Sequence, residues 1–293
     1  MNRLNVLEGD YMYPGHLGCP GCGATIAMKF ALKPLEGKAV MVIPACCWCI
    51  IAGSFPQTSL KVPILQAGFA TAAATASGVR AALDMRGDTE TTVVAWAGDG
   101  GTFDIGFQAL SGAVERNEDI IYVCYDNEAY MNTGVQRSSS TPFGTQTTTT
   151  PGQGWKNTRK KNIVEILAAH RIPYAATANI AFPEDMIRKV QKSKELKGGS
   201  RFIHVFATCP TGWRVPTEAS VKIARLAVQT NIFPLYEVED GIHYTINYEG
   251  NRSVRDYLTP QGRFKHLTEE NFDDIQKIVD EDWDLLHRKV RMY

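Results

Sequence analysis

The stretch TTVVAWAGDGG, residues 91–101, is the clearest indicator of the fold class of this chain. A short run of β-branched and apolar residues is typical of a buried strand. The glycines that follow, Gly98, Gly100 and Gly101, would let backbone N–H groups come close to a bound anion. Alone, a Gly-Asp-Gly sequence indicates only a tight turn after a strand. Its meaning therefore depends on what the neighbouring strands carry.

A second polar motif follows the next predicted strand. The run IIYVCY, 120–125, continues into DNEAYMNTG, 126–134, and places Asn127 28 positions after Asp99. That separation is the length of a strand–helix–strand crossover, so both side chains should reach the same edge of a parallel sheet. Carboxylate and amide oxygens are the ligands that Mg²⁺ prefers. The pair of motifs predicts a Mg²⁺-bridged diphosphate site, in the pattern typical of thiamine diphosphate.

The remainder of the chain repeats this alternation of strands and helices, which predicts an α/β fold: a mostly parallel sheet with helices on both faces. The predicted strands are 39–43, 91–97, 120–125, 174–178 and 202–207. The predicted helices are 67–85, 106–117 and 183–196, with a charged helix over 268–290.

The predicted organisation is a main domain, 1–230, followed by an extension, 231–293, that packs on it or on a partner subunit. The segment 131–162 is rich in Thr, Ser, Gly and Pro and has no periodicity. A loop of this length inside a compact domain is usually functional or disordered.

The seven cysteines are the other unusual feature. Cys19 and Cys22 precede an apolar stretch with helical spacing, and this spacing alone fits a redox dithiol, a zinc site or an iron–sulfur site. The runs CCWC, 46–49, and CPTGW, 209–213, each follow a predicted strand. Because parallel strands end at one edge of the sheet, Cys47 and Cys209 can lie beside the Cys19–Cys22 loop.

Composition excludes some classes of function. Lys plus Arg and Asp plus Glu both total 31 among 293 residues, so the net charge does not point to nucleic acid or to an anionic membrane. No apolar run has the length of a membrane span, and the N-terminus does not resemble a signal peptide. We expect a cytoplasmic protein, in which an odd number of cysteines argues against a disulfide framework.

The motifs GHLGCPGCGA, GDGGTFDIGFQALSGAVERNEDIIYVCYDNEAYMNTGVQRSSSTPFGTQTTTT and CPTGW together resemble the β subunits of 2-oxoacid:ferredoxin oxidoreductases, the family of pyruvate:ferredoxin oxidoreductase. The similarity extends through most of residues 15–236. It implies a thiamine diphosphate-binding fold that holds the diphosphate half of the cofactor and, close to it, one [4Fe–4S] cluster.

The resemblance also implies roles for individual residues. It places the cluster on Cys19, Cys22, Cys47 and Cys209, with the adjoining Cys46 as the alternative to Cys47. It adds the carbonyl of Ala129 to Asp99 and Asn127 as Mg²⁺ ligands, and it places Asn132 and Thr133 near the reacting part of the cofactor as catalytic residues. A structural zinc site is the main alternative for the cysteines, but a redox-silent ion could not accept electrons from the decarboxylated substrate.

The activity implied by the resemblance is oxidative decarboxylation of a 2-oxoacid, with electrons passed to ferredoxin and the acyl group to coenzyme A. The chain shows no general base for activating the cofactor. A partner α subunit is therefore expected to supply a carboxylate, and γ or δ ferredoxin-like subunits to hold further clusters. The chain should be inactive alone.

Three alternatives concern the activity. Pyruvate is the default substrate, but Gln57, Gln66, Ala70 and Gln146 stand where we expect aromatic or charged residues, which would suit a small dianion such as oxalate. Oxalate oxidation needs no coenzyme A. The second alternative is a non-catalytic electron-transfer subunit, and the third is a cluster-free thiamine enzyme of the acetolactate synthase kind.

Overall fold

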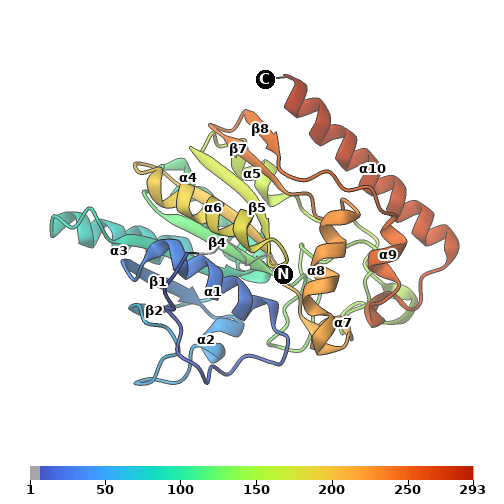
Figure 1. Ribbon diagram of the computed structural model, residues 1–293, viewed down its shortest axis with the longest axis horizontal. Coiled ribbons are helices and arrows are strands. Elements are labelled where there is room, and N and C mark those ends of the chain that lie inside the picture. The colour runs from blue at the N-terminus through green and yellow to red at the C-terminus, as the bar shows by residue number, and fades with distance from the viewer. Residues whose placement is uncertain (1–6, 293) are drawn as a thin grey trace.

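A single mixed sheet forms the centre of the molecule in the computed structural model, which describes residues 7–292 (Figure 1). The strand order is β2-β1-β3-β4-β6-β5-β7-β8. Neighbouring strands from β2 to β5 are parallel, whereas β7 and β8 are antiparallel additions at one edge. The strands are β1 Ala39–Pro44, β2 Ile64–Ala67, β3 Thr92–Gly98, β4 Ile121–Asp126, β5 Tyr174–Asn179, β6 Arg201–Phe206, β7 Tyr236–Glu239 and β8 His243–Ile246.

Helices cover both faces of the sheet. One apolar cluster contains residues of α1, α6 and α8, and the other contains residues of α3, α4 and α5. The α-helices are α1 Gly23–Leu35, α2 Cys47–Ile51, α3 Ala72–Met85, α4 Phe107–Glu115, α5 Ile163–Ala168, α6 Pro183–Glu195, α7 Pro210–Trp213, α8 Ser220–Gln229, α9 Val254–Leu258 and α10 Glu269–Met292. A π-helical turn spans Gly100–Asp104, and 3₁₀ turns span Gly152–Gly154, Thr217–Ala219 and Gly262–Phe264.

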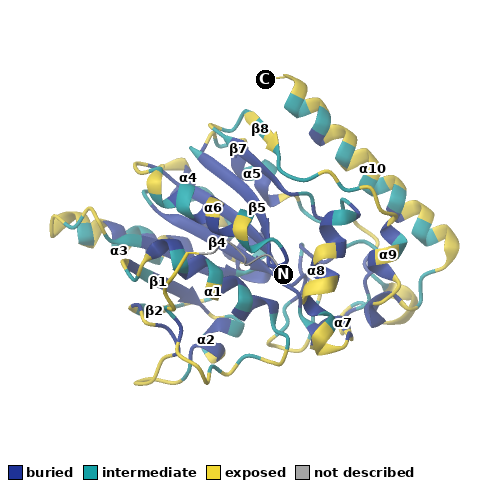
Figure 2. Cartoon of the chain, viewed as in Figure 1, coloured by how far each residue is buried: buried dark blue, intermediate teal, exposed yellow. Residues whose placement is uncertain are grey.

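Strand β3 is buried on both faces, as expected of a central parallel strand. Val94 and Trp96 point into the cluster with α1, whereas Val93, Ala95 and Ala97 point into the cluster with α3. The central strands of the sheet are accordingly dark along most of their length in Figure 2. This burial explains why the sequence of β3 is a continuous apolar run and does not alternate.

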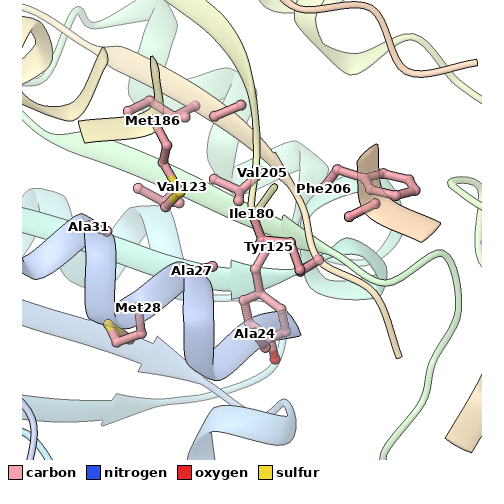
Figure 3. Packing of buried hydrophobic residues seen from close by; sticks show 14 of the residues in the cluster. Ala24, Ala27, Met28, Ala31, Val123, Tyr125, Ile180, Met186, Val205 and Phe206 are labelled. Carbon is pink, nitrogen blue, oxygen red and sulfur yellow. The ribbon is translucent and has the colours of Figure 1, made fainter. Parts of the chain in front are cut away.

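Helix α1 packs closely on the sheet because its inner face is built from small residues. Ala24, Ala27 and Ala31 lie opposite Val123 and Tyr125 of β4 (Figure 3). Alanine leaves the helix axis near the strands, so the residues that precede α1 reach the edge where β4 and β6 end. This packing fixes where the Cys19–Cys22 loop lies.

The predicted fold class is confirmed, and the five predicted strands are present within about two residues of their bounds. The predicted helix 67–85 begins later than expected. Ala67 belongs to β2 and α3 begins at Ala72, because residues 68–71 form a turn closed by Thr71 N–H donating to the Gly68 carbonyl at 3.0 Å.

The segment after residue 231 adds β7 and β8 to the same sheet. These strands were not predicted, although Asp240 and Gly241 between alternating runs are typical of a hairpin turn. Helix α10 follows and contacts β8 and α9. Between residues 7 and 292, no helix combines the length and apolar character that a bilayer span requires.

Candidate active site

The polar motifs meet at the carboxyl edge of the sheet. Residues after β1, β3 and β4 line one cavity of about 140 Å³ there. Its wall consists of Ala45, Cys46, Cys47, Phe69, Gly98, Asp99, Gly100, Gly101, Tyr125, Asn127, Ala129, Tyr130, Met131, Asn132 and Thr133. Pockets that enclose a ligand of cofactor size are usually about 300 Å³ or larger. The cavity has room for only part of such a ligand.

The Asn127 amide group lies beside two oxygen atoms at one side of this cavity. The Asn127 side chain lies so that its terminal amide atom is 2.9 Å from the Ala129 carbonyl oxygen and 3.2 Å from Asp99 Oδ1. If the amide oxygen occupies this position, three hydrogen-bond acceptors lie together with no hydrogen atom between them. If the amide nitrogen occupies it, the nitrogen would donate to the Ala129 carbonyl and to Asp99 Oδ1. Two oxygens bound side by side to Mg²⁺ at about 2.0–2.1 Å are roughly 2.9 Å apart. The predicted ligand set therefore fits the ion.

The electrostatics of Asp99 favour a bound cation. Its side chain is buried, and burial together with the neighbouring Asp126 carboxylate raises the pKa of Asp99 well above its usual range. Ser138 Oγ donates to Asp99 Oδ2 at 2.5 Å, which offsets part of this cost. A divalent ion bound beside Asp99 would offset much more of the cost of burying its ionised carboxylate. Such an ion supplies positive charge, and among the described residues no cationic side chain contacts Asp99.

Asp126 is held ionised by groups that the sequence did not reveal. Lys160 Nζ donates to its Oδ2 at 2.6 Å, and His204 Nε2 lies 2.7 Å from the same oxygen. Burial opposes ionisation, but Lys160 and His204 outweigh it and hold the pKa of Asp126 below its usual range. The Asp126 Oδ1 accepts from the N–H of Glu128 at 2.8 Å. Asp126 thus shapes the turn that carries Asn127.

A buried ion pair fixes the same turn from the C-terminal extension. Arg263 Nη2 donates to Glu128 Oε2 at 2.6 Å, and the two side chains are 2% and 1% exposed. The Arg263 guanidinium also stacks on Trp213, 3.9 Å from the ring centroid. Trp213 Nε1 in turn donates to the Asn127 carbonyl at 2.8 Å. No sequence signal marked Arg263, which is 135 positions from Glu128.

The glycines after β3 have steric reasons to be glycine. A Cβ on Gly100 would lie 2.4 Å from a ring atom of Tyr130, whose hydroxyl donates to Asp104 Oδ2 at 2.9 Å. Gly98 and Gly101 line the cavity, with Tyr125, Cys46 and Phe69 as neighbours. Side chains here would displace these neighbours or fill the cavity, so the bare backbone remains available to an anionic group.

The cysteines of three separate segments approach one another above this cavity. Burial and the neighbouring Cys209 and Cys22 thiols raise the pKa of Cys47 to about 12. Burial likewise raises the pKa of Cys209 to about 11, with Cys22 and Cys19 as its charged neighbours. Thiolates placed this close repel one another unless metal charge binds them. The structure thus brings together Cys19, Cys22, Cys47 and Cys209.

Zinc and an iron–sulfur cluster would use four cysteines in different ways. Among residues 7–292, no three Cys, His, Asp or Glu side chains converge on a single ion position. A zinc site needs such convergence, since each sulfur lies about 2.3 Å from one ion. In a [4Fe–4S] cluster each thiolate binds a different iron, so the sulfurs stand further apart.

Cys46 and Cys47 have different neighbours. The neighbours of Cys47 include Cys209, Cys22 and Cys19, whereas those of Cys46 are Cys49 and Tyr125. This geometry favours Cys47 as the third ligand. Cys124 is fully buried within β4 and behaves as a small apolar residue.

Gly23 is predicted to set the approach of the Cys19–Cys22 loop to Cys209. A Cβ on Gly23 would lie 2.4 Å from the backbone nitrogen of Thr208, and the Gly23 N–H donates to the Thr208 carbonyl at 2.9 Å. Gly23→Ala should push these backbones apart and lower the iron content of the purified protein by more than half. Gly78→Ala is the matched control: a Cβ on Gly78 would meet no atom within 4 Å, so iron content should not change. Equal iron in both variants would contradict the prediction.

The remaining predicted residues are more exposed. Asn132 and Thr133 line the cavity but are exposed on this chain, and Thr133 Oγ1 donates to Gln136 Oε1 at 2.6 Å. Gln57 and Gln66 are exposed, and Gln146 donates to the Gly152 carbonyl at 3.0 Å. Gln57, Gln66, Ala70 and Gln146 do not line the cavity beside Asp99. The pocket wall near Asp99 is instead apolar, with Phe69, Tyr130 and Met131.

Comparison with known proteins identifies the family of the chain. Residues 51–205, which include β3, β4 and the Asp99–Asn127 pair, match the model of the thiamine pyrophosphate enzyme C-terminal TPP binding domain. The ketoisovalerate oxidoreductase subunit VorB of Pyrococcus furiosus is 48% identical, with 99% of this chain and 97% of that protein covered. The chain belongs to the family of VorB and PorB subunits of 2-oxoacid oxidoreductases. The resemblance inferred from the sequence is confirmed.

Members of this family that are named for different substrates are about equally similar to the chain. The pyruvate synthase subunit PorB of Methanocaldococcus jannaschii is 49% identical, with 94% of this chain and 96% of that protein covered. The 2-oxoglutarate:ferredoxin oxidoreductase of Magnetococcus marinus, solved with 2-oxoglutarate, coenzyme A and succinyl-CoA, has a TM-score of 0.60 at 21% identity, with 75% of this chain and 82% of that chain covered. At this identity the likeness concerns the fold.

Proposed function

We propose that this chain is the subunit of a 2-oxoacid:ferredoxin oxidoreductase that binds the diphosphate of thiamine diphosphate through Mg²⁺ and carries one [4Fe–4S] cluster. The observation that carries the proposal is the position of the Asn127 amide group, 2.9 Å from the Ala129 carbonyl oxygen and 3.2 Å from Asp99 Oδ1, separations suited to oxygens around octahedral Mg²⁺. Bound thiamine diphosphate supplies a carbon nucleophile and an electron sink for decarboxylation of a 2-oxoacid.

The chain's own residues would position and shield that chemistry. Asp99 and Asn127 anchor the diphosphate end, while the backbone at Gly100 and Gly101 leaves room for its oxygens. Phe69, Tyr130 and Met131 form an apolar wall that excludes water near the reacting atoms. Asn132 and Thr133 offer amide and hydroxyl groups to the substrate or to the reacting end of the cofactor.

The four cysteines would place an electron acceptor beside this cavity. Cys47 belongs to both parts of the site. It lines the cavity, and Cys22 and Cys209 are its neighbours. Cys19, Cys22, Cys47 and Cys209 would hold the cluster there, and it would supply one-electron chemistry beside the cavity. The same position makes a purely structural zinc site a weaker explanation, since zinc has no redox chemistry.

Partner subunits are part of the proposal. The cavity holds only part of a cofactor, and Asn132 and Thr133 are exposed at its rim. Carboxylates of the described residues near it are engaged: Asp104 with Tyr130, Asp126 with Lys160, and Glu128 with Arg263. We therefore assign the carboxylate that activates the cofactor to an α subunit, and further electron carriers to γ or δ subunits and ferredoxin.

The apolar wall favours a 2-oxoacid with a small apolar side chain. Pyruvate remains the reference substrate, and a branched 2-oxoacid such as 2-ketoisovalerate, named for the VorB relatives, fits the same surface. The residues that suggested oxalate do not line this cavity. Oxalate is therefore the second candidate, after the monocarboxylic 2-oxoacids.

The test uses the intact complex purified without oxygen. Pyruvate, 2-ketoisovalerate and oxalate are each added with and without coenzyme A, and bleaching of the iron–sulfur absorbance is followed. We expect turnover with a monocarboxylic 2-oxoacid that requires coenzyme A. Reduction by oxalate without coenzyme A would instead support the second candidate, and a complex that contains no iron would contradict the proposal.

A further inference from the structure

The run CCWC, 46–49, contains two cysteines that the cluster does not use. Cys46 is the residue just before α2, and Cys49 lies one turn into this helix, so their Cα atoms are neighbours. The Cys49 N–H donates to the Cys46 carbonyl at 3.1 Å, which holds the turn closed. The two side chains are close neighbours within this turn. Disulfides require neighbouring Cα atoms and facing Cβ atoms. Cys46 and Cys49 meet the first condition because they lie in the same helical turn.

The surrounding packing keeps the two thiols together. Trp48, between them in sequence, is fully buried; its Nε1 donates to the Ala24 carbonyl at 3.3 Å, and its ring packs edge-on against Trp96 at 6.5 Å. Trp48 thus anchors in the core the helical turn that carries Cys46 and Cys49. Cys49 also donates to the Pro44 carbonyl at 3.0 Å.

The pair is separate from the proposed cluster ligands although it adjoins one of them. Cys46 has Cys49 and Tyr125 as its neighbours, whereas Cys47 has Cys209 and Cys22 as its neighbours. Cys46 and Cys49 are both partly exposed, so a small thiol reagent can reach them. Cys46 also lines the cavity beside Gly98.

From this geometry we infer that Cys46 and Cys49 form a site of reversible oxidation, an intrachain disulfide that leaves Cys47 to the cluster. The oxidant is a low-molecular-weight disulfide. The two protein thiols lose two protons and two electrons and form one S–S bond; the electrons cleave the S–S bond of the reagent, and its two sulfurs take up the protons as thiols. The inference rests on the chain's own sulfur atoms and does not require the proposed activity.

The experiment uses the intact complex, equilibrated without oxygen against an excess of oxidised glutathione and against reduced glutathione. Free thiols are then alkylated under denaturing conditions, and tryptic peptide 39–61, which contains Cys46, Cys47 and Cys49, is weighed. We expect three alkyl groups on the reduced sample. We expect one alkyl group on the oxidised sample, together with the loss of two hydrogen atoms, and recovery of three after dithiothreitol. Three alkyl groups in both samples, or a stable adduct with glutathione, would overturn the inference.

Two variants identify the partners. Cys49→Ser and Cys46→Ser should each leave a peptide with two alkyl groups after oxidised glutathione and no loss of hydrogen. A disulfide that persists in Cys46→Ser would join Cys47 to Cys49 and would refute the assignment. Iron is measured in the same samples: loss of iron from the untreated complex argues against the proposed cluster but leaves the disulfide result standing, so the two failures are distinguishable.

Discussion

Asp99→Asn should abolish cofactor binding while leaving the chain folded and, without metal, more resistant to unfolding. The amide has the shape of the carboxylate but lacks its charge, so the oxygen set loses its only ionised member at Mg²⁺. Loss of groups that merely support metal ligands typically costs 10–100-fold in affinity, and loss of the charged ligand should cost about 100-fold or more. Affinity for Mg²⁺ and thiamine diphosphate is measured by titration calorimetry on the complex.

The expected gain in stability of the metal-free Asp99→Asn protein follows from the pKa of Asp99. Burial and Asp126 raise that pKa, so ionised Asp99 destabilises the folded chain at neutral pH when no cation is present. The amide removes this cost, and the urea midpoint of the metal-free protein should rise. Asp274→Asn, at an exposed position of α10, is the control and should change neither quantity. Unchanged cofactor affinity in Asp99→Asn would rule out Asp99 as a ligand.

Arg263→Met should lower the free energy of unfolding by about 3–5 kcal/mol, because it leaves the buried Glu128 carboxylate without its closest cation. Lys160 Nζ, 3.2 Å from Glu128 Oε1, compensates for only part of that charge. The stacking of Arg263 on Trp213 is also lost, which frees the indole that donates to the Asn127 carbonyl. Cofactor affinity should therefore fall together with stability. Urea unfolding followed by tryptophan fluorescence measures the first effect.

The control for Arg263 is a salt bridge of the same chemistry at the surface. Arg252 pairs with Asp256 at 2.7 Å with both side chains about half exposed, so Arg252→Met should cost less than about 1 kcal/mol. Combining Arg263→Met with Glu128→Gln should restore part of the lost stability, since no unpaired charge then remains buried. Equal losses in Arg263→Met and Arg252→Met would show that burial does not govern the pair.

Arg263 gives the C-terminal extension a role at the active site. The extension contributes two strands to the sheet, and through Arg263 it also fixes the turn that carries Asn127. A truncation before residue 263 would remove this support even if the sheet still formed. The extension is thus coupled to the cofactor site by one buried guanidinium.

The fold class and the two motifs that define the cofactor site could be predicted from the sequence. Strands such as β3 are short, apolar and buried on both faces, so their composition predicts them without tertiary information. Asp99 and Asn127 were recognisable because each directly follows such a strand. The cysteine segments could be brought to one edge for the same reason, since parallel strands all end there.

The side chains that support that site became apparent only from the folded structure. Arg263, Lys160, His204 and Trp213 contact the turn after β4 from distant parts of the chain, and no local pattern marks such contacts. The split of CCWC into Cys47, facing the other cysteines, and Cys46, facing Cys49, likewise depends on how Trp48 anchors α2 in the core. Local periodicity determines which backbone segments form, whereas the direction of each side chain at a loop is fixed by packing between segments far apart in sequence.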